Sequence, residues 1–177
     1  MAVFARSEVR LACLATQPAE LASPFGSSRS LGRRNGGLHV EISAQVRNEP
    51  GQNAVSVSTA GSAKSLDVPS KESGPGSSVN GGELLMLALA TCYCNDLYRE
   101  AQRLGIAITG CEVIASARFE AVGLPAESVT YSARVDSSAS EEEIEFLLSE
   151  TDRLAEIHNT LRSGCRVQRV AWHGPAA

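Results

Sequence analysis

Cys92 is the residue of this 177-residue chain whose type and setting best suit it to chemistry. It follows an apolar run, Leu84 to Ala90, inside a longer segment, 82–97, that has the composition of a core helix. A buried thiol of this kind is either inert packing or a shielded reactive group. As a thiolate it is a strong nucleophile that can be oxidised to a sulfenic acid.

The helix around Cys92 predicts the neighbours of its sulfur. At about 100° per residue, six residues share the Cys92 face. They are Leu85, Ala88, Leu89, Asn95, Asp96 and Arg99. The three apolar residues are expected to line a binding pocket. Asp96 would raise the pKa of the thiol unless it is paired, and Arg99 is close enough to neutralise it.

The remaining cysteines and histidines predict no metal site and no cofactor. The five cysteines stand at positions 13, 92, 94, 111 and 165, and the histidines at 39, 158 and 173, without zinc-ligand spacing. An odd number of cysteines favours free thiols in a reducing compartment, and we expect a cytoplasmic protein. Cys94 points about 200° from Cys92 on a helix, so it cannot pair with Cys92 and is expected to be core packing.

The pattern of apolar residues predicts an α+β fold, with an antiparallel sheet packed on two main helices. Strands are expected at 39–46, 54–59, 112–119, 129–135 and 165–172, with a weaker one at 66–68. The helices are expected at about 82–104 and 141–162, each stopped by a glycine. Ser140 and Glu143 match a capping box at the start of the second. A helix as apolar as 84–90 needs burial on nearly all sides, which favours a homodimer.

Composition divides the chain into a segment at 1–37 and a domain at 38–177. The first segment is rich in arginine and, from Pro18 onward, in serine, proline and glycine, which would not pack well. Three interpretations compete: a flexible extension, an organelle transit peptide, or a short helix at 7–15 that docks on the domain. Two glutamates in the segment argue against the transit peptide.

Charge and hydropathy exclude two classes of partner. The formal net charge of −4 gives no electrostatic support for binding nucleic acid. No apolar run reaches the ~18 residues of a membrane-spanning helix, so we expect no membrane partner.

Two segments resemble the OsmC/Ohr family, the osmotically inducible and organic hydroperoxide resistance proteins. The run GGELLMLALATC, with GPG at 74–76 before it, resembles the helix that carries the peroxidatic cysteine of that family, and Cys92 falls on this position. The segment 155–161 resembles a later Cys-Pro-Val-x-x-Thr-Leu motif, in which Ala155 replaces the resolving cysteine and Glu156 the proline. The resemblance covers roughly 38–172.

The resemblance implies an intertwined homodimer with Cys92 as the peroxidatic residue near the interface. An arginine of the N-terminal hairpin activates the family's cysteine, and Arg47 is the best positional match; otherwise it is a solvated turn residue. A glutamate ten residues before the cysteine orients that arginine, but Gly82 stands there and Glu83 one residue later. Glu83 is therefore a catalytic candidate or, more simply, a stabiliser of the helix start. His158 is a candidate proton donor and binding residue, or a surface or capping residue.

Three functions remain open at the level of sequence. The first is a thiol-dependent peroxidase for organic hydroperoxides in the oxidative stress response, using Cys92. Since Ala155 cannot form a disulfide, this mechanism requires an external thiol reductant. The second is a non-peroxidatic protein that binds an apolar small molecule at the dimer interface. The third is a structural protein in which Cys92 is buried and inert.

Overall fold

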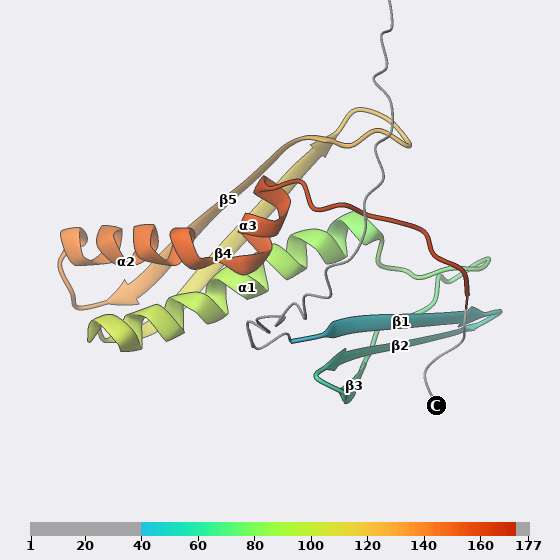
Figure 1. Ribbon diagram of the computed structural model, residues 1–177, viewed down its shortest axis with the longest axis horizontal. Coiled ribbons are helices and arrows are strands. Elements are labelled where there is room, and N and C mark those ends of the chain that lie inside the picture. Colours follow the sequence, from blue (N-terminus) through green and yellow to red (C-terminus); the bar gives the residue numbers. More distant parts are fainter. Residues whose placement is uncertain (1–39, 173–177) are drawn as a thin grey trace, which may run out of the picture. The chain divides into compact units, whose positions relative to one another are not determined.

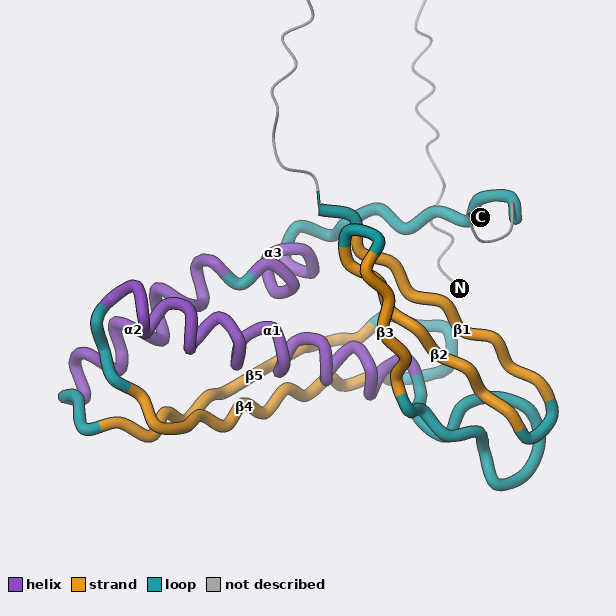
Figure 2. Tube along the Cα trace, turned by 90° about the horizontal axis from the view of Figure 1, so that it is seen from below, coloured by secondary structure: helices purple, strands orange, loops and turns teal. Residues whose placement is uncertain are grey.

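A computed structural model describes residues 40–172 of the chain. It has an α+β fold with two antiparallel sheets and three helices (Figures 1 and 2). The predicted α+β class is confirmed. The segment predicted at 1–37, with its possible helix at 7–15, lies outside the described residues.

The first sheet is a three-stranded meander in the order β1-β2-β3. β1 (Ile42–Glu49) and β2 (Gln52–Thr59) form the predicted hairpin, and Gly51 takes the left-handed conformation that the turn requires, with φ of 74°. β3 (Ser62–Leu66) lies earlier than the predicted 66–68 strand. A tight turn at 60–61, with positive φ at both residues, returns the chain at once to pair with β2.

The second sheet is a long hairpin of β4 (Ile108–Phe119) and β5 (Ala126–Ser137). Both strands extend beyond the predicted 112–119 and 129–135. Alternate side chains of β4 are half-buried and exposed, as expected for a strand with one face against helices. The register shifts between Ile108 and Gly110, just before Cys111.

Helix α1 (Gly81–Leu104) agrees with the predicted 82–104. Asn80 caps its start: its side chain accepts from the Glu83 amide, and the Glu83 carboxylate accepts from the Asn80 amide at 2.7 Å. Gly105 ends the helix with φ of 72°. Within residues 40–172, no helix is long and apolar enough to span a membrane.

Replacement of Asn80 by alanine is expected to lower the free energy of unfolding by about 1 kcal/mol, because the Glu83 amide loses its acceptor. The melting temperature should fall by about 3 °C. Asn95→Ala is the matched control, since Asn95 is an exposed residue within the same helix and alanine favours helix. Equal losses of thermal stability in the two variants would contradict the capping role.

The second predicted helix, 141–162, is wrong as a single element, because it is broken into two. α2 (Glu141–Leu154) begins with the predicted capping box of Ser140 and Glu143, and α3 (Glu156–Arg162) follows directly. Ala155 separates them in an extended conformation, with ψ of 104°. The related motif has proline after this position, which disfavours a helical residue before it. Here the same break occurs with Ala155 and Glu156.

The core lies where α1 packs on the β4–β5 hairpin and on α2. Leu97 of α1 and Leu147 of α2 are completely buried, together with Ala155 at the break. Tyr93 extends this cluster and donates its hydroxyl to the Leu148 carbonyl at 2.8 Å. The break between α2 and α3 therefore packs into the core through Ala155.

The predicted closing strand at 165–172 is wrong for this chain. These residues form neither helix nor strand. Val167, Val170 and Trp172 are largely exposed, so the apolar alternation that predicted a strand is not accompanied by burial.

Candidate functional site

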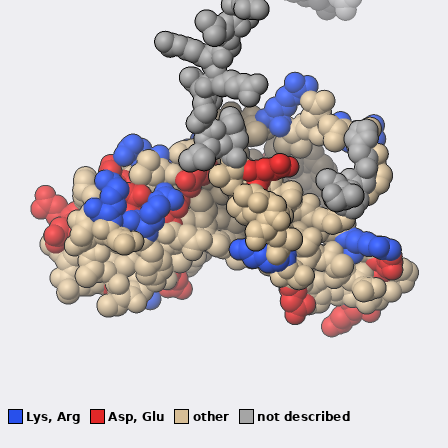
Figure 3. Space-filling view, turned by 60° about the horizontal axis from the view of Figure 1, so that its bottom comes forward, with Lys and Arg blue, Asp and Glu red and all other residues tan. Residues whose placement is uncertain are grey.

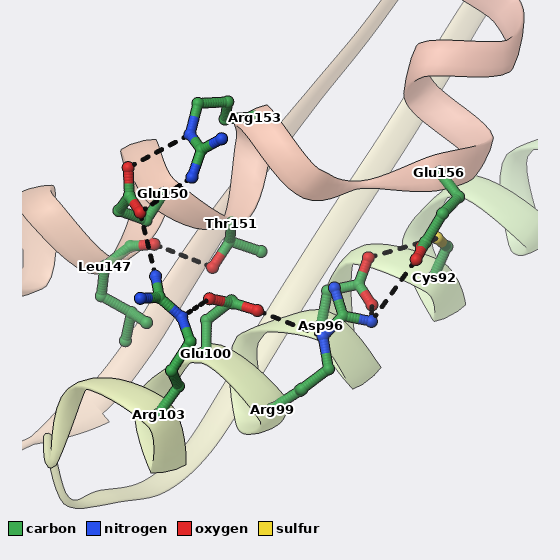
Figure 4. Close-up of polar contacts among 10 residues, drawn as sticks. All are labelled: Cys92, Asp96, Arg99, Glu100, Arg103, Leu147, Glu150, Thr151, Arg153 and Glu156. Carbon is green, nitrogen blue, oxygen red and sulfur yellow. Dashed lines mark hydrogen bonds and ion pairs between the residues drawn. The ribbon is translucent and has the colours of Figure 1, made fainter.

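Cys92 lies on α1 opposite the break between α2 and α3. Its thiol donates to Asp96 Oδ2, one turn further along α1, at 3.4 Å, and lies 4.0 Å from Glu156 Oε2 (Figure 4). The backbone amide of Ile157, in the first turn of α3, lies close enough to the sulfur to lower the pKa of the thiol. Two segments that are 64 residues apart therefore meet at one half-buried thiol.

Arg99 joins the acidic groups around the thiol. Its guanidinium contacts Asp96 Oδ1 at 2.8 Å and Glu156 Oε1 at 3.6 Å. The predicted pairing of Asp96 with Arg99 is confirmed. Within residues 40–172, Arg99 is the guanidinium that forms ion pairs with both carboxylates beside Cys92.

Burial raises the pKa of the Cys92 thiol above its usual 9.0. The Asp96 and Glu156 carboxylates raise this pKa further, whereas the Ile157 amide lowers it because an N–H donor stabilises the thiolate. Burial also raises the pKa of Asp96, which the contacts with Cys92 and Arg99 partly oppose. Cys92 is accordingly a protonated thiol at neutral pH, with a hydrogen-bond acceptor and a thiolate-stabilising donor both in place.

A second ion-pair network fixes α1 against α2 next to the site. The Glu100 carboxylate is buried and contacts both Arg99 and Arg103. Arg103 reaches Glu150 of α2 at 2.9 Å (Figure 4). The two arginines hold the pKa of Glu100 below its usual range. The network keeps the α1 face that carries Asp96 in a fixed position relative to α2.

The donor atoms of Cys92, Asp96 and Glu156 lie within 4.8 Å of one another and are the described residues closest to a metal-binding set. Arg99 already supplies a positive charge to both carboxylates. A cation could use this set only if the guanidinium moved away, so the arrangement suits an ion-pair cluster better than a metal centre.

Two residues predicted for the site have other contacts in this chain. Arg47, on β1, is 76% exposed at its side chain and pairs with Glu49 at 2.6 Å. Glu83 is engaged in the capping box of α1. The contacts of Glu83 therefore agree with its interpretation as a stabiliser of the helix start. Activation of Cys92 by Arg47 stays a prediction.

Leu89 and His158, both predicted as binding residues, line one apolar pocket of about 250 Å³. The other lining residues come from β5 and α3: Val129, Tyr131, Leu161 and Arg162. Leu85 and Ala88 are not among the residues that line it. Cys92 is one turn from Leu89 on α1, so the pocket and the thiol are neighbours on the same helix.

His158 is the buried polar group of this pocket. It is only 3% exposed, and neither ring nitrogen has a hydrogen-bond partner. Its ring packs edge-on against Tyr131, at 4.4 Å between centroids, and in a tilted arrangement against Tyr93, at 5.4 Å. The structure therefore places His158 in the interior rather than at the surface.

Burial, followed by the nearby positive charge of Arg162, lowers the pKa of His158 from its ordinary 6.5. The unfolded chain then binds a proton more readily than the folded one, so stability should fall as pH drops below 6.5. We expect His158→Phe, which keeps an aromatic ring between the two tyrosines, to reduce this loss. Urea unfolding of the wild-type protein and of the variant at pH 7 and pH 5 measures this loss of stability. An equal loss between the two pH values in both proteins would contradict the prediction.

Three contributions to the site were not predicted from the sequence. Glu156 and the Ile157 amide reach Cys92 only because the helix breaks at Ala155, and the sequence predicted no break. Tyr131 faces the pocket from β5. The alternation of this strand was predicted, but the helix that packs against it was not. The signal in the sequence for the first contribution was the replacement of the proline of the related motif by Glu156.

Comparison with known proteins identifies the family of the chain. The family model described as OsmC-like protein matches residues 74–169, which include Cys92, Asp96, Glu156 and His158. Since the match covers more than half of the chain, the protein belongs to the OsmC-like family. A search of proteins with curated descriptions gave no match.

Solved structures support the OsmC-like fold. An OsmC-like protein from Mycoplasma pneumoniae is 18% identical, with a TM-score of 0.53 over 71% of this chain and 89% of the other. An organic hydroperoxide resistance protein OsmC from Legionella pneumophila is 17% identical, with a TM-score of 0.51 over 71% and 91%. One from Elizabethkingia anophelis is 17% identical, with a TM-score of 0.51 over 70% and 89%. At these identities the similarity establishes the fold alone.

Proposed function

We propose that this protein is a thiol-dependent reductase of organic hydroperoxides that acts through Cys92 in the response to oxidative stress. The observation that carries the proposal is the polar setting of the thiol, which combines a proton acceptor, Asp96, with an N–H donor, Ile157. An inert core cysteine has no need of either group. Two structural relatives are named as organic hydroperoxide resistance proteins, which supports the same class of substrate.

The reaction begins when the Cys92 thiolate attacks one oxygen of the hydroperoxide. The S–O bond forms, the O–O bond breaks, and the departing alkoxide takes a proton to become an alcohol. Cys92 is left as a sulfenic acid, having lost two electrons to the peroxide. Asp96 accepts the thiol proton, and the Ile157 amide stabilises the sulfur anion before attack.

Return to the thiol requires two molecules of an external monothiol or one dithiol. The first thiol condenses with the sulfenic acid, which forms a mixed disulfide with Cys92 and releases water. The second thiol attacks this mixed disulfide and releases the Cys92 thiolate. Ala155, at the position of the resolving cysteine in related proteins, cannot supply this thiol. Cys94 faces away from Cys92 and contacts Cys111 instead. The external reductant is thus an expected partner.

Exposed apolar residues support the proposal of a homodimer. Leu87 of α1 and Ile114 of β4 are each more than half exposed, although both belong to apolar segments. On the face drawn in Figure 3, basic and acidic side chains are interspersed, and wide areas carry neither. Exposed apolar side chains of this kind are available for contact with a second copy of the chain. Arg47 remains the predicted activator of Cys92 in this assembly.

Free thiols favour a reducing compartment such as the cytoplasm.

The proposal is tested by following consumption of cumene hydroperoxide and of hydrogen peroxide with the purified protein. We expect turnover with monothiol and dithiol reductants, faster with cumene hydroperoxide, and its complete loss in Cys92→Ser. Cys165→Ser is the matched control, since Cys165 is exposed and lies beyond α3. Turnover that survives in Cys92→Ser, or is absent from the wild-type protein, would refute the proposal.

A second candidate function is the binding of an apolar small molecule. The observation that favours it is His158, whose buried nitrogens lack partners and line an otherwise apolar pocket. A ligand with an apolar body and one polar group would satisfy the histidine. Co-purification of such a ligand with Cys92→Ser, without peroxide consumption by the wild-type protein, would favour this function over the first.

A further inference from the structure

Cys94 and Cys111 bring two thiols together outside the Cys92 site. Their sulfur atoms are 3.2 Å apart, and neither residue is in a disulfide. Cys94 lies on α1, two residues after Cys92, and Cys111 lies on β4. Since residues at i and i+2 diverge by about 200° on a helix, Cys92 faces the α2–α3 break while Cys94 faces the hairpin.

The elements that carry the pair hold the two sulfurs in this position. α1 packs along β4, and both cysteines are half-buried at that contact. The register shift in β4 between Ile108 and Gly110 comes just before Cys111, and such irregularities redirect the following side chains. The Tyr98 hydroxyl, one turn after Cys94, lies close enough to Cys111 to lower the pKa of that thiol. The pair is thus a defined cluster with a polar neighbour.

We propose that Cys94 and Cys111 form a redox-active dithiol that closes reversibly to an intramolecular disulfide when it meets a low-molecular-weight disulfide. A disulfide needs a sulfur separation of about 2.05 Å, so the two atoms must approach by roughly 1 Å. Rotation of the two side chains can provide this movement without a change in the helix–strand packing. The site does not depend on the reaction of Cys92.

The exchange proceeds in two balanced steps. One thiolate of the pair attacks a sulfur of the small disulfide, forms a mixed disulfide and expels one thiolate. The second cysteine then attacks the protein sulfur of that mixed disulfide and expels the other small thiolate. The protein loses two electrons, and its two thiol protons leave with the two small thiols.

Burial and the neighbouring Cys94 raise the pKa of Cys111 to about 11, and the Tyr98 hydroxyl partly opposes this increase. Cys111 therefore stays protonated at neutral pH, and closure of the pair is slow. Raising the pH toward 9 should accelerate closure, because the fraction of thiolate increases. Closure ties the middle of α1 to β4, so the oxidised form should be more resistant to heat.

The test uses the full chain carrying Cys92→Ser, incubated while folded with oxidised glutathione. We expect intact mass to fall by two hydrogens, and a non-reducing tryptic map to join peptide 72–99 to peptide 104–118. The Cys92 substitution is needed because peptide 72–99 carries both Cys92 and Cys94. The melting temperature should rise by about 5–10 °C and return on reduction.

Controls separate this pair from other thiols. Cys94→Ala and Cys111→Ala should each abolish the crosslink, whereas Cys165→Ser should retain it. Since either alanine variant could fold poorly, intact mass and peptide mapping of the chain with both cysteines present give the decisive result. Three results in the folded protein would overturn the proposal: unaltered thiols at Cys94 and Cys111, a stable mixed glutathione disulfide at either of them, or a crosslink of either to Cys165.

Discussion

Asp96→Asn is expected to make Cys92 about tenfold more reactive at pH 7. The Asp96 carboxylate raises the pKa of the thiol through its charge and its hydrogen bond, and asparagine keeps the shape without the charge. The thiolate is the form that is alkylated, and while the thiol form dominates its fraction rises about tenfold for each unit by which a pKa falls. The rate of alkylation by iodoacetamide between pH 6 and pH 10 measures the change.

Glu156→Gln is the matched control for Asp96→Asn. Glu156 is 69% exposed at its side chain and lies 4.0 Å from the sulfur, so its charge is better screened by solvent. We expect an increase of less than about twofold in the alkylation rate at pH 7. Peroxide consumption should nevertheless slow in Asp96→Asn, because this variant lacks the carboxylate that accepts the thiol proton. A slower rate in both assays would contradict the assigned effect on the pKa.

Ala155→Cys is expected to convert the protein to a peroxidase that resolves its own sulfenic acid. The next two residues, Glu156 and Ile157, contact the Cys92 sulfur, so a thiol at position 155 would enter the same neighbourhood. The mixed-disulfide step with an external thiol would be replaced by an internal disulfide. We expect turnover with a dithiol reductant to rise about tenfold, since internal attack gains effective concentration.

Ala155→Ser controls for the added atom at this completely buried position. Both variants should lose about 1–3 kcal/mol of stability through overpacking, measured by urea unfolding. Only Ala155→Cys should accelerate dithiol-dependent turnover and yield a disulfide to Cys92 after one equivalent of peroxide. A variant that folds but forms no such disulfide would show that residue 155 and Cys92 cannot pair.

Much of the fold could be predicted from local patterns. The apolar run and Gly105 predicted α1 to within one residue, and Ser140 with Glu143 predicted the start of α2. Both hairpins followed from period-two alternation and turn residues. The break at Ala155 was missed, because alanine and glutamate are both good helix formers and tertiary packing overrides that preference. The false strand at 165–172 came from alternation alone, without a partner.

The candidate site was predictable where it depends on one helix. The position of Asp96 and its pairing with Arg99 follow from helical spacing, and both were predicted. Contacts between distant segments were not, so the sequence indicated neither Glu156 beside Cys92 nor Cys111 beside Cys94. His158 was expected as a proton donor and binding residue or as a surface or capping residue, and its burial against Tyr131 of β5 was not predicted.

The central claim is that Cys92 is oxidised by an organic hydroperoxide and waits for an external thiol. A single-turnover reaction tests it most directly: fully reduced protein receives one equivalent of cumene hydroperoxide without reductant, with dimedone present as a sulfenic-acid trap. We predict one mole of cumyl alcohol per mole of protein and a dimedone adduct at Cys92, located by tandem mass spectrometry. Unconsumed peroxide with an unmodified Cys92 would contradict the account.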